Sequence, residues 1–389
     1  MSATDLPERV LHAVRQVVPA EIGNVGLHEP SFKGREVDYV LDCLKTGWVS
    51  SVGAYVDRFE AMLTEYTGAK YAVATANGTA ALHVALLLAG VEANDEVLMP
   101  ALTFIATANA IRYCNAVPHF VDVAMDTLGV DPKALAGHLE AVAERRGDFW
   151  FNRQTGRRLR AIVPMHTFGH PVDIDRLLPV CASFNLAMIE DAAESLGSTY
   201  HGVHTGNFGL VSAVSFNGNK IITTGGGGAI LTNDTELGRR AKHLTTTARV
   251  SHRWEFTHDE VGFNYRLPNL NAALGCAQME VLPDFLERKR QLAARYASAF
   301  SSQQDLHFVR EPDGACSNYW LNAILLPEGQ IEQRDTVLQI LNAAGLMARP
   351  CWTLMHRLAM YTHCPRAALP IAEGVEKRLL NLPSSPMLA

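Results

Sequence analysis

Short apolar runs alternate with segments of helical spacing between residues 71 and 190. The apolar run 71–76 precedes a helical segment that reaches Leu88, and the run 96–99 precedes another at 105–113. Strands that alternate with helices are typical of a mostly parallel sheet with helices on both faces. We therefore predict an α/β fold for this part of the chain. Three further apolar runs continue the alternation, at 117–123, 160–165 and 186–190.

The pattern changes beyond residue 270. A long helical stretch covers 271–300, and shorter elements follow it: a strand at 319–326, a helix at 330–344 and a closing helix at 375–382. The polar and aromatic segment 148–158 is predicted as an inserted loop. These boundaries predict four parts: an N-terminal helix and loop (1–30), a large domain (31–270), connecting helices (271–304) and a small C-terminal α/β domain (305–389).

The composition is that of a globular protein with an ordinary core. Of the 389 residues, 48% are hydrophobic and 19% are charged, and the formal net charge is -6. No run of Lys or Arg stands out, which argues against a nucleic-acid partner. The seven cysteines are scattered without a CxxC pair, so we expect a reduced, cytoplasmic compartment and no metal site. The most apolar helical segment, 80–91, is too short to span a bilayer, so no membrane partner is expected.

A single lysine, Lys220, lies in the middle of the segment SFNGNKIITTGGGG, which covers residues 215–228. Apolar runs flank this segment, so a strand, a turn and a second strand are predicted. A lone amine on a turn with little bulk suits a lysine that holds a flat cofactor as a Schiff base. A surface hairpin with a solvated lysine is the alternative, and this stretch alone does not separate the two.

Polar residues follow three of the predicted strands. Ligands gather at the carboxyl ends of parallel strands, so these positions are candidates for one site. The turn 77–79, which contains Gly78 and Thr79, is either a phosphate cradle or an ordinary helix cap. Asp191 either pairs with a protonated ring nitrogen or caps the next segment. Ser215 either joins Thr79 on the phosphate or is an ordinary residue at a strand end.

Each of these signals is weak alone, but together they form an ordered set: anion turn, carboxylate, hydroxyl and lysine. An aromatic residue, Phe104, follows the run 96–99. It would either stack on a flat ring or pack in the core. The set as a whole favours a site for a flat, phosphorylated cofactor.

Five motifs together resemble the DegT/DnrJ/EryC1/StrS family of pyridoxal-phosphate sugar aminotransferases, over about residues 27 to 385. The resemblance implies fold type I, with a large domain built on a mostly parallel mixed sheet flanked by helices and a small C-terminal α/β domain. It also implies pyridoxal 5'-phosphate as cofactor. The motifs are NGTAALH at 77–83, PALTF at 100–104, DAAE at 191–194, SF at 215–216 with Lys220, and GFNYR at 262–266.

The resemblance implies roles around the cofactor ring. Lys220 would bind the cofactor covalently and then act as the base that moves protons. Asp191 would pair with the pyridine nitrogen, and Phe104 would stack on the ring. Glu194 lies where many relatives carry Gln, near the ring hydroxyl. Family dehydratases replace the lysine with histidine, so the presence of Lys220 favours amino transfer.

The resemblance also implies a phosphate site that is shared between subunits. Gly78, Thr79 and Ser215 would hold the phosphate from one chain, and Asn264 would reach it from the neighbouring subunit. The expected assembly is therefore a homodimer whose active sites lie at the interface.

Three stretches, GWVSSVG at 47–53, PMHTFGHP at 164–171 and the segment 215–228, look most similar to the LegC branch. This branch aminates C4 of a nucleotide-linked 4-keto-6-deoxy-N-acetylhexosamine for legionaminic acid or bacillosamine-type surface polysaccharides. Glutamate would be the donor in a ping-pong reaction that releases 2-oxoglutarate. A GDP-perosamine-synthase-like or other keto-sugar aminotransferase is the alternative. A non-catalytic regulatory protein that binds the cofactor is a further alternative, against which Lys220 and Asp191 argue.

Contacts to the sugar nucleotide are expected from two polar, aromatic stretches. Arg249 and Trp254 precede Asn264, and Arg349 and His356 lie in the small domain. Each of the four is either a substrate contact or an ordinary ion pair or packed side chain.

Overall fold

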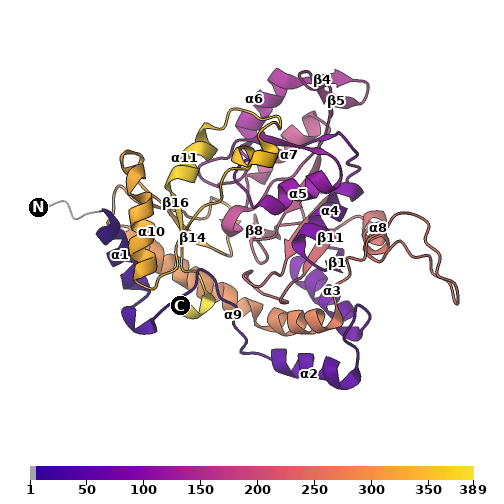
Figure 1. Cartoon of the computed structure of the whole chain (residues 1–389), viewed down its shortest axis with the longest axis horizontal. Helices are drawn as coiled ribbons and strands as arrows, with labels where there is room; N and C mark the ends of the chain where they lie inside the picture. Colours follow the sequence, from indigo (N-terminus) through magenta and orange to yellow (C-terminus); the bar gives the residue numbers. More distant parts are fainter. Residues whose placement is uncertain (1–5) are drawn as a thin grey trace, which may run out of the picture.

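A nine-stranded mixed sheet forms the centre of the larger part of the chain (Figure 1). The computed structural model describes residues 6–389, so the first five residues of the predicted N-terminal segment lie outside the described part. The main strand order is β1-β11-β10-β7-β6-β2-β3. All neighbouring pairs from β10 to β3 are parallel, and β11 is antiparallel to both β1 and β10. The strands are β1 (Tyr71–Thr75), β2 (Glu96–Pro100), β3 (Val117–Val121), β6 (Arg158–Ile162), β7 (Ala187–Asp191), β10 (Val211–Ser215) and β11 (Gly228–Thr232).

Helices cover both faces of this sheet. On one face, α4 (Gly78–Leu88) packs against α5 (Ile105–Tyr113) and β10, and nearly all its residues are buried. A helix that is apolar all round can be stable only in such a buried position. On the other face, α3 (Ala54–Thr67) packs against α9 (Asn269–Phe300). Phe59 of α3 also contacts Phe216, the residue after β10, at a ring distance of 5.0 Å. The expected α/β fold with a flanked, mostly parallel sheet is thereby confirmed.

A second, four-stranded antiparallel sheet lies in the C-terminal part. Its order is β12-β14-β16-β15, and α1 (Leu6–Val17) and α10 (Arg334–Ala343) pack together beside it. The long helix α9 runs from the first sheet to this region (Figure 1). The strands are β12 (His307–Phe308), β14 (Asn322–Leu325), β15 (Arg349–Pro350) and β16 (Leu379–Leu382).

Two local predictions are wrong. The segment 375–382 is not one helix, because α11 (Pro370–Arg378) ends where β16 begins, and β16 pairs with strands on both sides. A short apolar run does not distinguish a helix from a buried strand, and here the pairing decides. The segment 148–158 is not a loop either: β4 (Ala143–Arg146) and β5 (Phe149–Asn152) form a hairpin that joins β6.

Shorter elements complete the chain. The loop after α8 (Thr235–Thr245) forms an arm, residues 249–261, that extends from the body of the molecule (Figure 1). Within residues 6–389, no helix is both long and apolar enough to cross a bilayer. The remaining α-helices and strands are α2 (Glu36–Thr46), α6 (Pro132–Val142), α7 (Ile174–Ser183), β8 (Thr199–Tyr200), β9 (Val203–His204) and β13 (Ala315–Cys316).

Candidate active site

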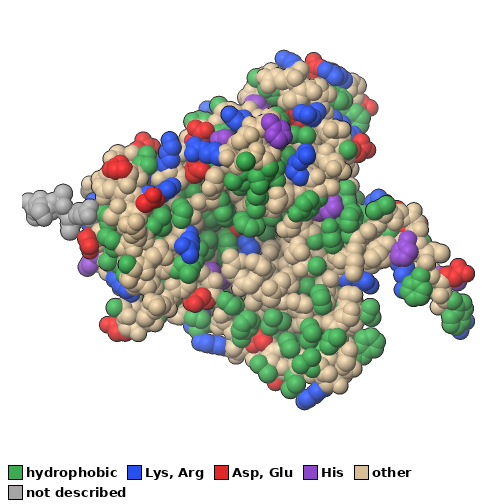
Figure 2. Space-filling view, in the orientation of Figure 1, with side chains coloured by type: hydrophobic (Ala, Val, Ile, Leu, Met, Phe, Trp, Pro, Cys, Tyr) green, Lys and Arg blue, Asp and Glu red, His purple; other side chains and the backbone are tan. Residues whose placement is uncertain are grey.

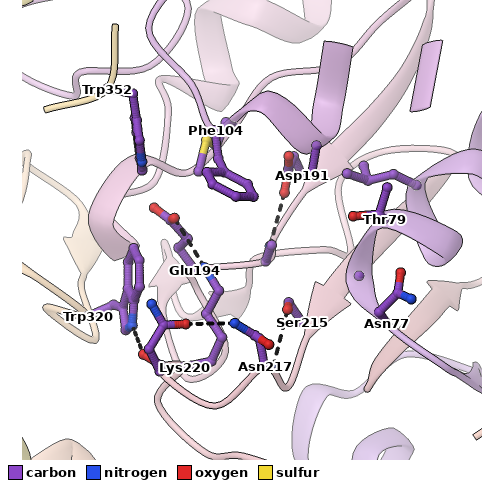
Figure 3. A pocket seen from close by; sticks show the side chains of 16 residues that line it. Asn77, Thr79, Phe104, Asp191, Glu194, Ser215, Asn217, Lys220, Trp320 and Trp352 are labelled. Carbon is purple, nitrogen blue, oxygen red and sulfur yellow. Dashed lines mark hydrogen bonds and ion pairs between the residues drawn. The ribbon is translucent and has the colours of Figure 1, made fainter. Parts of the chain in front are cut away.

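A cavity of about 310 Å³ opens at the carboxyl ends of the parallel strands (Figure 3). The edge of the sheet supplies its floor, and two tryptophans from the C-terminal part, Trp320 and Trp352, supply part of its wall. This is where a doubly wound sheet collects ligands. Seven predicted site residues line this one cavity: Gly78, Thr79, Phe104, Asp191, Glu194, Ser215 and Lys220.

The turn before α4 forms one end of the cavity. The Asn77 side chain caps the helix, because its Oδ1 accepts a hydrogen bond from the Ala80 N–H at 2.8 Å. A Cβ on Gly78 would lie 2.9 Å from the Ser215 Cβ, so only glycine lets the turn approach Ser215 this closely. The N–H groups of the first helical turn have no acceptor within the helix. With the Thr79 and Ser215 hydroxyls, the Gly78 and Thr79 N–H groups form a cradle that fits a phosphate group.

Asp191 ends β7 and lies at the floor of the cavity, 2% exposed. Its Oδ2 accepts a 2.6 Å hydrogen bond from the Thr107 hydroxyl, and its Oδ1 accepts one from the Ala193 N–H at 3.2 Å. Burial raises the pKa of this carboxyl, and those two hydrogen bonds and the charge of Lys220 only partly oppose the shift. A buried carboxyl of this kind is best satisfied by a cation, which is what a protonated pyridine nitrogen supplies.

Lys220 lies on the turn between β10 and β11. Two buried residues that follow it, Ile221 and Ile222, anchor the turn in the core, and the Lys220 N–H donates to the Asn217 carbonyl at 3.0 Å. The side chain is 11% exposed and points into the cavity, where its Nζ lies 3.2 Å from Glu194 Oε1. The lysine therefore extends into the cavity as the sequence pattern indicates.

Glu194 is the ion-pair partner of Lys220. Its Oε2 also accepts a 2.9 Å hydrogen bond from the Phe168 N–H. Burial raises the pKa of Glu194 to about 7, against the opposing effect of the Lys220 charge. Glu194 can therefore exchange a proton near neutral pH beside the Lys220 amine.

Aromatic side chains enclose the open side of the cavity. The Phe104 ring is 49% exposed and lies 6.4 Å from the Trp352 ring, which in turn lies 5.1 Å from the Phe168 ring. Figure 3 shows Phe104 between Trp352 and Asp191. Phe104 is therefore placed to cover a flat ring whose nitrogen reaches Asp191. The anion cradle, the buried carboxyl, the amine and this ring surface together fit pyridoxal 5'-phosphate.

The predicted residue Asn264 lies outside the cavity of its own chain. It is exposed, and its Oδ1 accepts hydrogen bonds from the Arg266 guanidinium at 3.0 and 3.2 Å.

The four candidates for sugar contacts are not among the residues that line the cavity. On the arm, the Arg249 guanidinium lies 4.0 Å from the centre of the Phe256 ring, and Trp254 is 73% exposed. In the C-terminal part, Arg349 is exposed on the short strand β15, which pairs with β16. His356 is buried, with its Nε2 3.4 Å from Glu373 Oε1.

Comparison with known proteins relates the chain to one family. The profile of the DegT/DnrJ/EryC1/StrS aminotransferase family matches residues 30–389. GDP-perosamine synthase from Escherichia coli O157:H7 is 37% identical over 365 residues, with 94% of each chain covered. The GDP-perosamine synthase of Caulobacter vibrioides is 37% identical over 368 residues, again with 94% of each chain covered. The crystal structure of a DegT DnrJ EryC1 StrS aminotransferase from Brucella abortus has a TM-score of 0.82 at 28% identity and covers 91% of both chains.

Proposed function

The chain belongs to the DegT/DnrJ/EryC1/StrS aminotransferase family, and on that premise we propose that it moves an amino group from glutamate to C4 of a nucleotide-linked 4-keto-6-deoxy sugar. It is a pyridoxal-phosphate-dependent sugar aminotransferase. The observation that carries the proposal is the meeting of Lys220, Asp191 and the cradle 77–79 in one cavity. A protein that only binds the cofactor has no need of a part-buried amine beside a carboxyl whose pKa is raised to about 7.

Each side chain has a part in holding and using the cofactor. Thr79 and Ser215 bind its phosphate, and Asp191 binds its ring nitrogen while Thr107 fixes the carboxyl. When bound, pyridoxal 5'-phosphate supplies the carbonyl group that exchanges amino groups and the electron sink that stabilises negative charge.

Lys220 is the proton carrier. In the first half of the reaction its Nζ takes the proton from the α-carbon of the amino donor, and in the second half it supplies the proton that C4 of the sugar gains. Glu194 holds that Nζ on the cavity side of the turn, at 3.2 Å.

Two sugars are supported by different observations. The GDP-perosamine synthases, at 37% identity over nearly the whole chain, favour a GDP-linked keto sugar of the perosamine type. The LegC-like stretches at 47–53, 164–171 and 215–228 favour a 2-N-acetylated sugar linked to a nucleotide. We place the perosamine-type substrate first because its support extends over about 365 residues rather than three short motifs.

The assembly belongs to the same proposal. Asn264 is exposed outside its own cavity, which suits a residue that completes the phosphate site of a second copy. Figure 2 shows hydrophobic side chains gathered over α2, at the lower edge of the molecule. Apolar residues on one such face indicate a protein interface. They are Phe32, Val37, Leu41 and Leu44, between 43% and 76% exposed.

The test is an assay of the purified enzyme with pyridoxal 5'-phosphate and glutamate against a panel of 4-keto-6-deoxy sugar nucleotides. The panel pairs GDP-linked hexoses with UDP-linked N-acetylhexosamines, and NMR of the product identifies the carbon that carries the amine. We expect turnover of a GDP-linked sugar and none with Lys220→Ala. Turnover of only the N-acetylated sugars would replace the first substrate by the second, and no turnover of any 4-keto sugar would contradict the proposed substrate class.

A second readout separates a catalyst from a protein that merely binds the cofactor. Adding glutamate without any sugar should shift the visible absorption band of the holoenzyme, because the first half of a ping-pong reaction needs only the donor. A band that persists at saturating glutamate would contradict glutamate as donor.

A further inference from the structure

The Lys220 amine has a second neighbour besides Glu194. Its Nζ lies 3.8 Å from the centre of the Trp320 ring system, over the face of the indole. An ammonium group in this position is attracted by the ring quadrupole, and Trp is the strongest partner for it. Trp320 is 4% exposed, so the contact is shielded from water, which strengthens it.

Trp320 belongs to a strap, residues 317–321, that ties the C-terminal part to the loop that carries Glu194 and to the turn that carries Lys220. The Asn318 amide donates to the carbonyls of Glu194 and Leu196, each at 2.9 Å. The Trp320 indole N–H donates to the Asn219 carbonyl, next to Lys220, at 2.7 Å. The strap therefore fixes the indole relative to the lysine and relative to the glutamate.

The backbone of the strap is held in an unfavourable shape. Tyr319 has φ +47°, in the left-handed region that bulky residues rarely adopt. Its N–H donates to the Ser317 hydroxyl at 3.0 Å, and its own hydroxyl accepts from the Glu311 N–H at 3.1 Å. The buried Lys289 Nζ donates to the Trp320 carbonyl at 3.0 Å. Strain that is held by several contacts beside a reactive group indicates that the position of this indole matters.

We propose that Trp320 is a positioning residue whose indole face is the resting place of the Lys220 amine whenever that amine is not bonded to the cofactor. The lysine is released from the cofactor and taken up again in every cycle of amino transfer, so its free amine needs a defined position. Glu194 alone would attract the amine strongly only while its carboxyl is charged. That carboxyl, with a pKa of about 7, loses its charge as it takes up a proton. The indole face does not titrate and holds the ammonium in either state of Glu194. This inference goes beyond the proposed function, since it requires only the family's cofactor and no particular sugar.

The test uses the full-length enzyme loaded with pyridoxamine 5'-phosphate, which has an amine in place of the aldehyde and so leaves Lys220 free. A short pulse of acetic anhydride at neutral pH, followed by peptide mass spectrometry, measures how fast Lys220 is acetylated. The exposed Lys133 and Lys377 are internal references in the same sample. For Trp320→Leu we expect relative labelling of Lys220 to rise about three- to thirty-fold, the range that a cation–π contact supports. Trp320→Phe, which keeps an aromatic face, should stay within about three-fold of the wild type.

Trp352→Leu is the matched control, because Trp352 also lines the cavity but belongs to the aromatic group around Phe104 and Phe168. Trp352→Leu changes access to the cavity but leaves the surface under the amine in place. If that surface controls the labelling of Lys220, relative labelling in this variant should remain near that of the wild type. Equal increases for Trp320→Leu and Trp352→Leu would mean that access alone controls labelling, and the proposal would be wrong.

A crystal structure of the wild-type enzyme with pyridoxamine 5'-phosphate gives a result that needs no variant. We expect the Lys220 Nζ over the Trp320 indole face, and an amine that turns away from it would overturn the proposal. Neither measurement involves a sugar, so an incorrect sugar assignment and an incorrect role for Trp320 are separately detectable.

Discussion

One hydroxyl group helps to keep the buried Asp191 carboxyl charged. Thr107 lies in the first turn of α5, and its Oγ1 donates the 2.6 Å hydrogen bond that stabilises the buried carboxylate. A hydrogen bond to a charged group contributes about 1.5–3 kcal/mol. Its loss should raise the pKa of Asp191 further and weaken the hold on a protonated ring nitrogen.

Thr107→Val should therefore lower the affinity for pyridoxal 5'-phosphate by about ten- to a hundred-fold, measured by titration of the visible absorption band. Thr107→Ser keeps the hydroxyl and should bind nearly as well as the wild type. Equal losses in the two variants would show that the methyl group, and not the hydrogen bond, is what the site needs.

Glu194 links the stability of the cofactor-free enzyme to pH. Its pKa is raised from 4.5 to about 7, so the folded state holds a proton that the unfolded state releases above pH 4.5. The stability that this proton contributes is present below pH 4.5 and is lost as the pH rises to about 7. Glu194→Gln removes this titration.

The free energy of unfolding of Glu194→Gln, relative to the wild type, should therefore increase with pH across this window, by about 3 kcal/mol at most, and be flat above it. Urea titrations of the cofactor-free proteins at several pH values measure the difference. The constant offset includes the lost contact with Lys220, so only the slope is diagnostic. A difference that does not change with pH would mean that Glu194 does not titrate in this range.

At the scale of elements, the start of β11 and the turn before α4 approach each other closely at glycine residues. A Cβ on Gly228, the first residue of β11, would lie 2.6 Å from the Asn77 carbonyl carbon. The run of four glycines therefore has a partial explanation, because Gly228 lets β11 pass against the phosphate cradle. Gly226, two residues earlier, has open space where a Cβ would be.

Gly228→Ala should push the cradle aside and destabilise the protein by about 1–3 kcal/mol, the usual effect of overpacking. The affinity for pyridoxal 5'-phosphate should fall with it, since the Gly78 and Thr79 N–H groups move. Gly226→Ala is the control from the same run and should leave both quantities unchanged. Thermal melts measure the stability of the two variants, and cofactor titrations measure their affinity. Similar behaviour of both variants would contradict a role for the close approach of β11 to the phosphate cradle.

Local signals predicted the part of the site that lies at strand ends. Asp191 directly follows an apolar run, Gly78 lies in the turn after another, and Ser215 lies near the end of a third. Lys220 lies on the glycine-rich turn, so sequence order alone placed all four at one edge of the sheet. Phe104 was found in the same way.

Residues that arrive from elsewhere in the fold left no such signal. Thr107 is an ordinary helix residue until the fold brings its hydroxyl to Asp191, and Trp320 becomes part of the cavity wall only when the C-terminal part folds back. In the stretch that carries Arg349 and His356, Trp352 is the side chain that lines the cavity. Strand β16 was predicted as helix for the same reason, because its identity depends on partners that are distant in the sequence.

At the scale of the whole molecule, the apolar face of α2 predicts association. Val37 is 76% exposed and Leu41 is 43% exposed. A charge placed on such a face would have to be desolvated in an interface, so Leu41→Arg should shift the protein toward the monomer. Lys45→Gln, on the same helix, should leave the assembly as it is. Light scattering coupled to size exclusion measures the mass, and an unchanged mass for Leu41→Arg would place the interface elsewhere.

The proposed role of Asn264 makes a stricter prediction, because a residue that serves the neighbouring site can be supplied by a different chain. Asn264→Ala alone should lose most activity through weaker phosphate binding, and Lys220→Ala should be inactive. In a mixed dimer of the two variants, one site has an intact lysine from one chain and an intact Asn264 from the other. Random mixing in equal amounts makes about half of the dimers mixed, so about a quarter of the wild-type activity should return. If Asn264 served its own chain instead, every site in the mixture would lack one of the two residues, and mixing would restore nothing.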